Sequence, residues 1–362
     1  MSVYEWMVAL ILMAALILKG NKRGSKQFVA VAFVFLFCVM GLRDVGRIGV
    51  DSVGSYPHAF RRAGEAGWGA LTGKGEAQYN LGFSFVLKLG HVITGGDYQF
   101  FIALLSVFIL TAYAHFILKY SPSPIQSILY FLGLLYFTLL FDALKQATAM
   151  AILLFAFDAV MEKKPGKFVC LVALAGSMHF PALIFLPGYW VGRMKIGKGY
   201  FTMLAALLLI TFLFRDWLLQ LMLKAYGSEE TEATMEGVQF FRTKALLMVG
   251  IVAAAVALRP PTAEDKVYSA LLVYAGIAIV FQTFCGYNNI FERLADYYFH
   301  TAIVLIPLVF ERLKLKHHNL TVKTEVTVKT FAPYVFSAYA VWRFLGTVKD
   351  SWFYSPFQFF WQ

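Results

Sequence analysis

The chain has 362 residues, of which 59% are hydrophobic and 15% charged, compared with roughly 45–50% and about 25% in soluble proteins. Together with a mean hydropathy of +0.65, this excludes an ordinary soluble fold, and apolar runs without strict alternation exclude a β-barrel. The net charge is +11, and the basic residues are concentrated in short loops. This distribution is typical of the cytoplasmic loops of membrane proteins, so the charge does not indicate a nucleic-acid partner. The composition predicts an all-α polytopic membrane protein with one integral membrane domain over residues 1–362.

Apolar runs long enough to cross a bilayer, about 17–25 residues, follow one another along the chain. They fall near 3–18, 28–42, 99–118, 125–141, 145–160, 200–218, 244–258, 267–285, 294–310 and 330–347. The run 168–190 contains Pro181, which cannot continue a regular helix. We interpret this run as a re-entrant helix pair, with a single crossing as the alternative. The prediction is about 10–11 transmembrane helices plus the pair.

The basic loops set the orientation, because lysine and arginine concentrate on the cytoplasmic side. The loops assigned to that side are 19–26, 119–124, 162–167, 193–198 and 312–329. A single crossing by 168–190 would move the last two to the outside, which is the reason for preferring the re-entrant pair. On this topology, two sizeable loops are external, 43–98 and 219–243.

Polar residues follow the second apolar run. Arg43 lies at its external end, with Arg47 one turn later and Asp51 eight residues away from Arg43. Two guanidinium groups at this position could bind a diphosphate through paired, charge-assisted hydrogen bonds. The alternative is that they extend toward the membrane surface or pair locally with Asp51.

Two further polar positions interrupt apolar segments. Lys145 and Gln146 begin a helix that is otherwise apolar, and Lys145 could bind substrate or simply reach the membrane surface. His179 stands beside the proline break. It is either a histidine satisfied within the core or a ligand or proton-transfer group at the tip of the re-entrant pair.

A third position is the external start of the helix near 294–310. Arg293 is predicted there, and a helix N-terminus itself attracts anions. Asp296 and Tyr297 follow one turn later. An Arg293–Asp296 pair within the helix is the alternative, and it would contribute only tenths of a kcal/mol.

Taken in order, these segments resemble the EpsG-like family of Wzy-type polysaccharide polymerases. The resemblance rests on G-L-R, G-x-D, Tyr and Phe within 41–60, L-K-Q-x-x-A at 144–149, S-x-H-x-x-A-L-I-F-L-P at 177–187, and E-R-x-x-x-Y at 292–297. The sequence departs from the family's usual pattern at two places. Lys145 stands where the family has arginine, and Tyr56 follows Asp51 by five residues, whereas the family's tyrosine usually follows by four.

The resemblance implies a glycosyltransferase of the GT-C-like class in the bacterial inner membrane, with its active site facing the periplasm. It would join oligosaccharide repeat units carried on polyprenyl diphosphate, beside a flippase and chain-length regulators as partners. His179 or Asp51 would accept the proton of the attacking hydroxyl. The substrate-binding residues would be Arg43, Arg47, Tyr56, Lys145, Gln146, Arg293 and Tyr297. Nothing in the sequence requires a metal or a cofactor.

Two other classes compete with this interpretation. A flippase of lipid-linked oligosaccharides needs the same anion-binding residues but no base, and it should carry charges along a pathway open to both sides. A membrane acyltransferase needs a histidine beside a carboxylate, which His179 lacks in the sequence. The charged groups favour the external side, as a polymerase requires.

Overall fold

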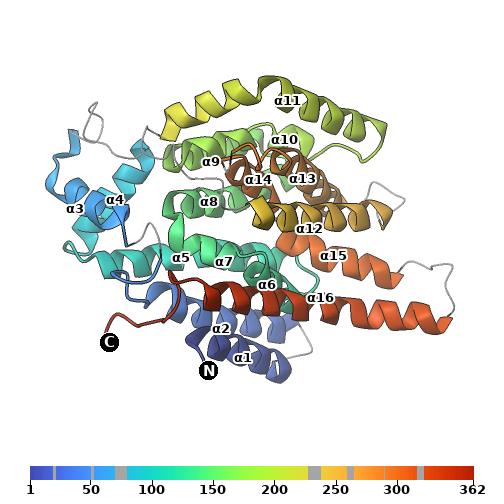
Figure 1. The fold of residues 1–362 in the computed structure, drawn as a ribbon, viewed down its shortest axis with the longest axis horizontal. Helices are drawn as coiled ribbons and strands as arrows, with labels where there is room; N and C mark the ends of the chain where they lie inside the picture. Colours follow the sequence, from blue (N-terminus) through green and yellow to red (C-terminus); the bar gives the residue numbers. More distant parts are fainter. Residues whose placement is uncertain are drawn as a thin grey trace. The chain divides into compact units, whose positions relative to one another are not determined.

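The computed structural model describes residues 1–18, 22–49, 53–69, 80–226, 238–258, 265–288, 290–315 and 322–362. Within these ranges the regular structure is helical and no β-strand forms (Figure 1). The chain divides into two compact units. Unit 1 comprises 1–155, 174–179 and 331–362, and unit 2 comprises 156–173 and 180–330. The all-α prediction is therefore confirmed for the described residues.

Unit 1 is built mainly from the N-terminal helices. These are α1 (Val3–Ile17), α2 (Lys22–Gly41), α3 (Ser55–Glu65), α4 (Leu81–Ile93), α5 (Tyr98–Tyr120), α6 (Pro124–Gly133) and α7 (Tyr136–Asp142). Helix α2 packs against α1, α5 and α6, and α3 packs against α4. Local sequence fixes several starts, since Ser2 and Glu5 form a capping box on α1 and Asp97 accepts from the Phe100 N–H at 2.9 Å on α5.

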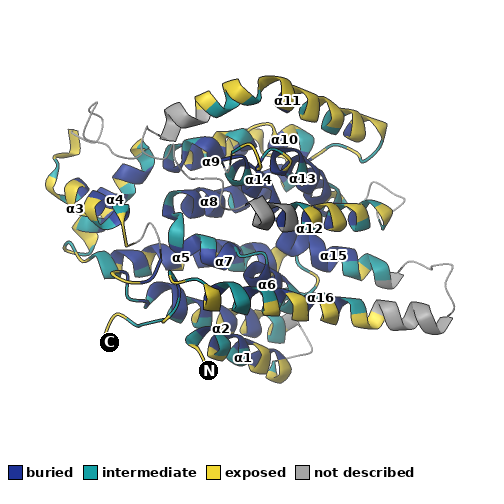
Figure 2. Ribbon diagram, viewed as in Figure 1, coloured by how far each residue is buried: buried dark blue, intermediate teal, exposed yellow. Residues whose placement is uncertain are grey.

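Unit 2 is organised around α13, most of which is buried (Figure 2). Its other elements are the 3₁₀ helix η2 (Phe180–Phe185), α10 (Gly188–Val191), α11 (Lys198–Tyr226), α12 (Val238–Ala257), α13 (Lys266–Gln282), α14 (Ile290–Phe299) and α15 (Ala302–Leu315). Helix α13 packs against α10, α11, α12, α14 and α15. Three helices, α8 (Leu144–Met161), α9 (Pro165–Met178) and α16 (Val322–Asp350), have residues in both units.

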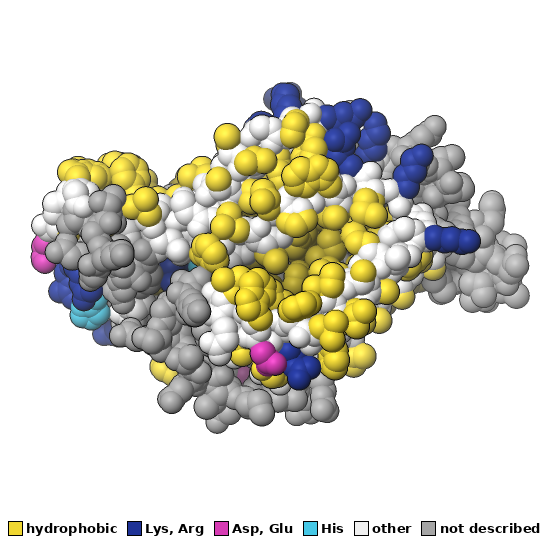
Figure 3. Space-filling view, turned by 90° about the horizontal axis from the view of Figure 1, so that it is seen from above, with side chains coloured by type: hydrophobic (Ala, Val, Ile, Leu, Met, Phe, Trp, Pro, Cys, Tyr) yellow, Lys and Arg dark blue, Asp and Glu magenta, His cyan; other side chains and the backbone are white. Residues whose placement is uncertain are grey.

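The described helices establish a multi-pass membrane protein. By length and composition four of them can cross a bilayer, namely α2, α5, α8 and α11, and up to six can if each of two bent helix pairs forms one span. Helix α11 exposes large apolar side chains such as Leu209, Leu213 and Trp217. Figure 3 shows hydrophobic side chains spread over this face, with lysine and arginine at its edge. A face of this kind suits contact with lipid.

Two apolar runs that the sequence predicts as continuous membrane spans are each divided into two helices. The window 125–141 contains α6 and α7, which meet at an angle of 53°, and the window 294–310 contains α14 and α15, which meet at 51°. The first break passes through Leu135, whose φ of 65° is left-handed. Neither break coincides with a proline, although Gly133 ends α6 at the first of them. Helices α11 and α12 also extend into the predicted loop 219–243, of which 227–237 lie outside the described residues.

Candidate functional site

Arg43 follows the end of α2 and is completely buried. Its guanidinium donates to three main-chain carbonyl oxygens, those of Ile48 at 3.3 Å, Phe141 at 3.4 Å and Met40. It also lies 4.8 Å from the centre of the Phe141 ring. Burial lowers the pKa of Arg43, yet an arginine side chain keeps its proton in proteins. The structure thus holds a buried cation whose described hydrogen-bond partners are all neutral.

The loop after Arg43 is held by the C-terminal segment 351–362. Three main-chain hydrogen bonds join them, from Asp44 N to Gln358 O (2.9 Å), Gly49 N to Phe353 O (3.0 Å) and Phe360 N to Leu42 O (3.1 Å). Gly49 has φ 104°, a backbone conformation that favours glycine. Pairing between segments about three hundred residues apart leaves no local signal.

Arg47 occupies a different environment from Arg43. Its side chain is 65% exposed and lies 3.5 Å from the Asp44 carboxylate, and it also donates to the side chain of Gln358. Exposed ion pairs of this kind contribute little to stability. The two arginines of the motif therefore differ in role, since one is enclosed and the other faces solvent.

The start of α8 lies beside Tyr56 of α3. The main-chain N–H of Lys145 donates to the Tyr56 hydroxyl at 3.4 Å, and the Tyr56 ring is buried against Phe83 at 5.7 Å between centroids. Residues predicted from separate motifs are therefore in contact within unit 1. The neighbouring Gln146 is 1% exposed, and neither polar atom of its side chain has a hydrogen-bond partner in the described structure.

His179 lies where α9 ends and η2 begins, so the break predicted at 177–181 is confirmed. The histidine is 2% exposed and its main-chain N–H donates to Ala175 O at 2.9 Å. Helix α9 has 14 residues, or about 21 Å at 1.5 Å per residue. Its end packs on α4, because a Cβ at Gly82 would lie 2.2 Å from Ser177 Oγ. His179 thus belongs to the same part of unit 1 as loop 43–98.

In unit 2 the motif residues Arg293 and Tyr297 lie on α14, Arg293 half-buried and Tyr297 fully buried. The start of this helix is partly capped, since the Asn288 side chain accepts from the Ile290 N–H at 2.9 Å. One of the N–H groups that could attract an anion is therefore already used.

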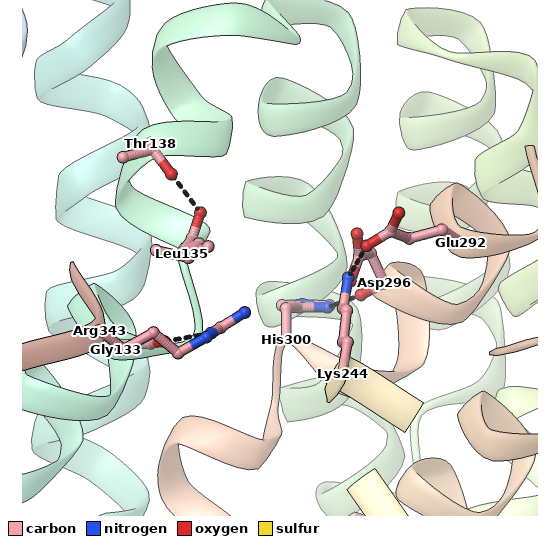
Figure 4. Close-up of polar contacts among 8 residues, drawn as sticks. All are labelled: Gly133, Leu135, Thr138, Lys244, Glu292, Asp296, His300 and Arg343. Carbon is pink, nitrogen blue, oxygen red and sulfur yellow. Dashed lines mark hydrogen bonds and ion pairs between the residues drawn. The ribbon is translucent and has the colours of Figure 1, made fainter. Parts of the chain in front are cut away.

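The strongest polar feature of unit 2 was not predicted. Lys244 of α12 lies 2.5 Å from a Glu292 oxygen and 2.9 Å from an Asp296 oxygen of α14 (Figure 4). All three side chains are largely buried. Asp296 therefore pairs with a lysine from another helix. Two features of the sequence could have indicated this cluster. One is a lysine at the start of an apolar helix, and the other is a pair of acidic residues four positions apart on another helix.

His300 adjoins this cluster at the bend between α14 and α15. It is completely buried, and its Nδ1 lies 2.9 Å from the main-chain oxygen of Asp296. Figure 4 shows the imidazole beside the ion-paired group. Thr301 satisfies a further carbonyl at the bend, donating from its hydroxyl to Tyr298 O at 2.9 Å. The bend is therefore stabilised by side chains rather than caused by proline.

The predicted site residues are divided between the units. Unit 1 contains six of them, namely Arg43, Arg47, Tyr56, Lys145, Gln146 and His179. Unit 2 contains Arg293 and Tyr297. Asp51, the other candidate base, lies outside the described residues. Direct contact between motifs is seen for Tyr56 and Lys145.

The model of the EpsG family matches residues 26–359, which is nearly the whole chain. No curated protein and no solved structure matches the chain.

Proposed function

Since the chain belongs to the EpsG family of Wzy-like polymerases, we propose that it extends a polysaccharide by glycosyl transfer between lipid-linked repeat units. A hydroxyl oxygen of the acceptor forms a bond to the anomeric carbon of the donor sugar. The bond from that carbon to the diphosphate breaks, and the diphosphate leaves with the electron pair. The hydroxyl proton passes to a base on the protein.

The observation that carries this proposal is the buried charge of Arg43. A buried ion is costly unless it is compensated, and the described hydrogen-bond partners of Arg43 are neutral carbonyls. Those contacts use three of the five N–H donors of a guanidinium. The nearby charge of Asp142 offsets part of the cost of burial, and a diphosphate would add further negative charge and accept hydrogen bonds from the remaining donors. Preorganised cations of this kind are the principal means of stabilising a departing anion.

Gln146 and Lys145 support the same location. The Gln146 amide is buried with its donor and acceptor groups unused, although nearly all buried polar groups in proteins are hydrogen-bonded. A sugar hydroxyl or a phosphate oxygen would satisfy it. Lys145, fixed through its main chain to Tyr56, would assist as a second cation, and Arg47 would meet substrate at the exposed edge.

His179 is our preferred proton acceptor. An imidazole can accept a proton, and His179 stands at an interruption of the helix, where side chains can reach a bound ligand. Asp51 is the second candidate. In unit 2, Arg293 and Tyr297 would contact the second lipid-linked unit, on a helix fixed by the Lys244 cluster.

The finer features predicted from the sequence belong to the same proposal. They are a GT-C-like arrangement of about 10–11 spans with a re-entrant pair, external loops 43–98 and 219–243, and a single membrane domain. The setting would be the bacterial inner membrane with the site facing the periplasm, and the partners would be a flippase and chain-length regulators. The pairing of loop 42–49 with the C-terminal segment supports this topology, because both are assigned to the external side.

The test uses the purified full chain in vesicles with lipid-linked repeat units extracted from cells that lack the protein. A ladder of longer products is expected. Arg43→Lys should reduce the ladder at least about tenfold, since lysine cannot reproduce the planar fork of donors. Arg61→Lys, at an exposed position of α3 outside the proposed site, is the matched control and should retain the ladder. Movement of the lipid across the vesicle without any extension would instead assign the protein to the flippases.

The Arg43 result must be separated from misfolding, because Arg43 also joins three segments of unit 1. Gel filtration and thermal unfolding of each variant provide that check. A folded Arg43→Lys protein with a full-length ladder would refute the role of Arg43.

A further inference from the structure

A second buried glutamine, outside every motif above, has no partner for its side chain. Gln282 is the last residue of α13 and is 3% exposed. Neither its Nε2 nor its Oε1 has a hydrogen-bond partner in the described part of the chain. Gln99 of unit 1 shows the usual state, since its Nε2 donates to Gly41 O at 3.0 Å and its Oε1 accepts from Val45 N at 3.3 Å.

Two buried hydroxyl groups around α13 are satisfied. The Tyr274 hydroxyl donates to Gly188 O at 2.8 Å, and the Tyr298 hydroxyl donates to Ile184 O at 2.6 Å. The Gln282 amide differs from them, since both of its polar atoms are without a hydrogen-bond partner in the described structure. A buried donor or acceptor without a partner is destabilising, so a residue of this kind calls for a ligand or for another explanation.

The turn after Gln282 leads toward the ion-paired cluster. Cys285 donates its N–H to Gln282 O at 3.2 Å. The carboxylates of the cluster are compensated by Lys244. The Gln282 amide itself is neutral, which favours a neutral ligand group over a phosphate.

We propose that Gln282 binds paired hydroxyl groups of the saccharide carried by the lipid. A carboxamide offers donors and an acceptor side by side, and adjacent sugar hydroxyls can accept from the one and donate to the other. The unit would then use Arg293 for the charged part of the substrate and Gln282 for its sugar. This inference rests on the proposed function, because it assigns a specificity-determining residue to the same substrate.

The test replaces Gln282 by methionine, which has the same unbranched length and no amide. If the amide awaits a ligand, Gln282→Met removes an unsatisfied group from the free protein, and the unfolding temperature should rise by about 2–4 °C. Binding of extracted lipid-linked repeat units should fall about tenfold or more, since two hydrogen bonds are lost. Binding of polyprenyl diphosphate without sugar should be unchanged.

Gln99→Met is the matched control for the sign of the stability change, because both groups of that amide are bonded to the main chain. It should lower the unfolding temperature. For Gln282→Met, a lower unfolding temperature would show that the amide has a structural partner and would overturn the inference. Undiminished binding of the lipid-linked units would overturn it as well.

The two proposals fail differently. If the unaltered protein produces no ladder, the polymerase function is refuted whatever Gln282 does. If it produces a ladder that Gln282→Met leaves unchanged, the polymerase stands and the assignment of Gln282 falls. Equal losses of binding for the sugar-bearing and the sugar-free lipid would place Gln282 at the diphosphate, which also contradicts the inference.

Discussion

Replacing Lys244 by methionine should be among the most destabilising single substitutions in unit 2. The lysine compensates two carboxylates at once, at 2.5 Å to Glu292 and 2.9 Å to Asp296. The side chains of Lys244, Glu292 and Asp296 are 11%, 17% and 6% exposed. Solvent therefore cannot stabilise the two carboxylates if the lysine is removed. Lys244→Met leaves two acids one helical turn apart on α14 with no counter-charge from α12.

Removing one partner of a buried ion pair typically costs about 3–5 kcal/mol. The bond from Lys244 to Asp296 is the more enclosed of the two, and the repulsion between the remaining carboxylates adds to its loss. We therefore expect the free energy of unfolding to fall by an amount within this range, and the unfolding temperature to fall clearly with it. Lys164→Met is the control, because Lys164 pairs with Glu162 at 3.0 Å but is 61% exposed, and exposed pairs contribute little.

The assay is thermal unfolding of the purified proteins in one detergent, followed by intrinsic fluorescence. A second variant isolates the cause. Adding Glu292→Gln and Asp296→Asn to Lys244→Met removes the unpaired charges and should recover most of the lost stability. If Lys244→Met is as stable as the unaltered chain, or if the triple variant is less stable than the single one, the buried ion network is not what holds α12 to α14.

Three further predictions follow from the other elements. Single cysteines at Gly67, Gly166 and Gly197, where a side chain meets nothing within 4 Å, should be labelled by an impermeant external reagent at Gly67 only; labelling at Gly197 would replace the re-entrant pair by a single crossing. His179→Ala should slow polymer extension about 10²–10⁴-fold with little change in binding of the lipid-linked unit, and a normal rate would remove it as the base. Gly82→Ala should lower both stability and extension, because its Cβ would overlap the end of α9; an unaffected unfolding temperature would contradict that packing.

Much of the candidate site could be identified from the sequence because its residues sit in local motifs. The order of the motifs predicted the family, and the match over 26–359 confirms it. The pattern could not distinguish the two arginines at 43 and 47, since burial depends on the fold. It also missed Lys244 and Gln282, which belong to no motif and become notable only through the partners they have or lack.

The sequence alone determined the membrane class and the position of most helices, because the length of an apolar run and the placement of lysine and arginine are local properties that the bilayer enforces. It also located the break beside His179, since Pro181 disrupts a helix wherever it occurs. The tertiary structure decided the rest. The bends at Leu135 and His300 have no proline, and Asp296 takes a partner 52 residues away. The Arg43 loop is held by the far end of the chain. Such partners are selected by packing between helices, and no local pattern encodes that choice.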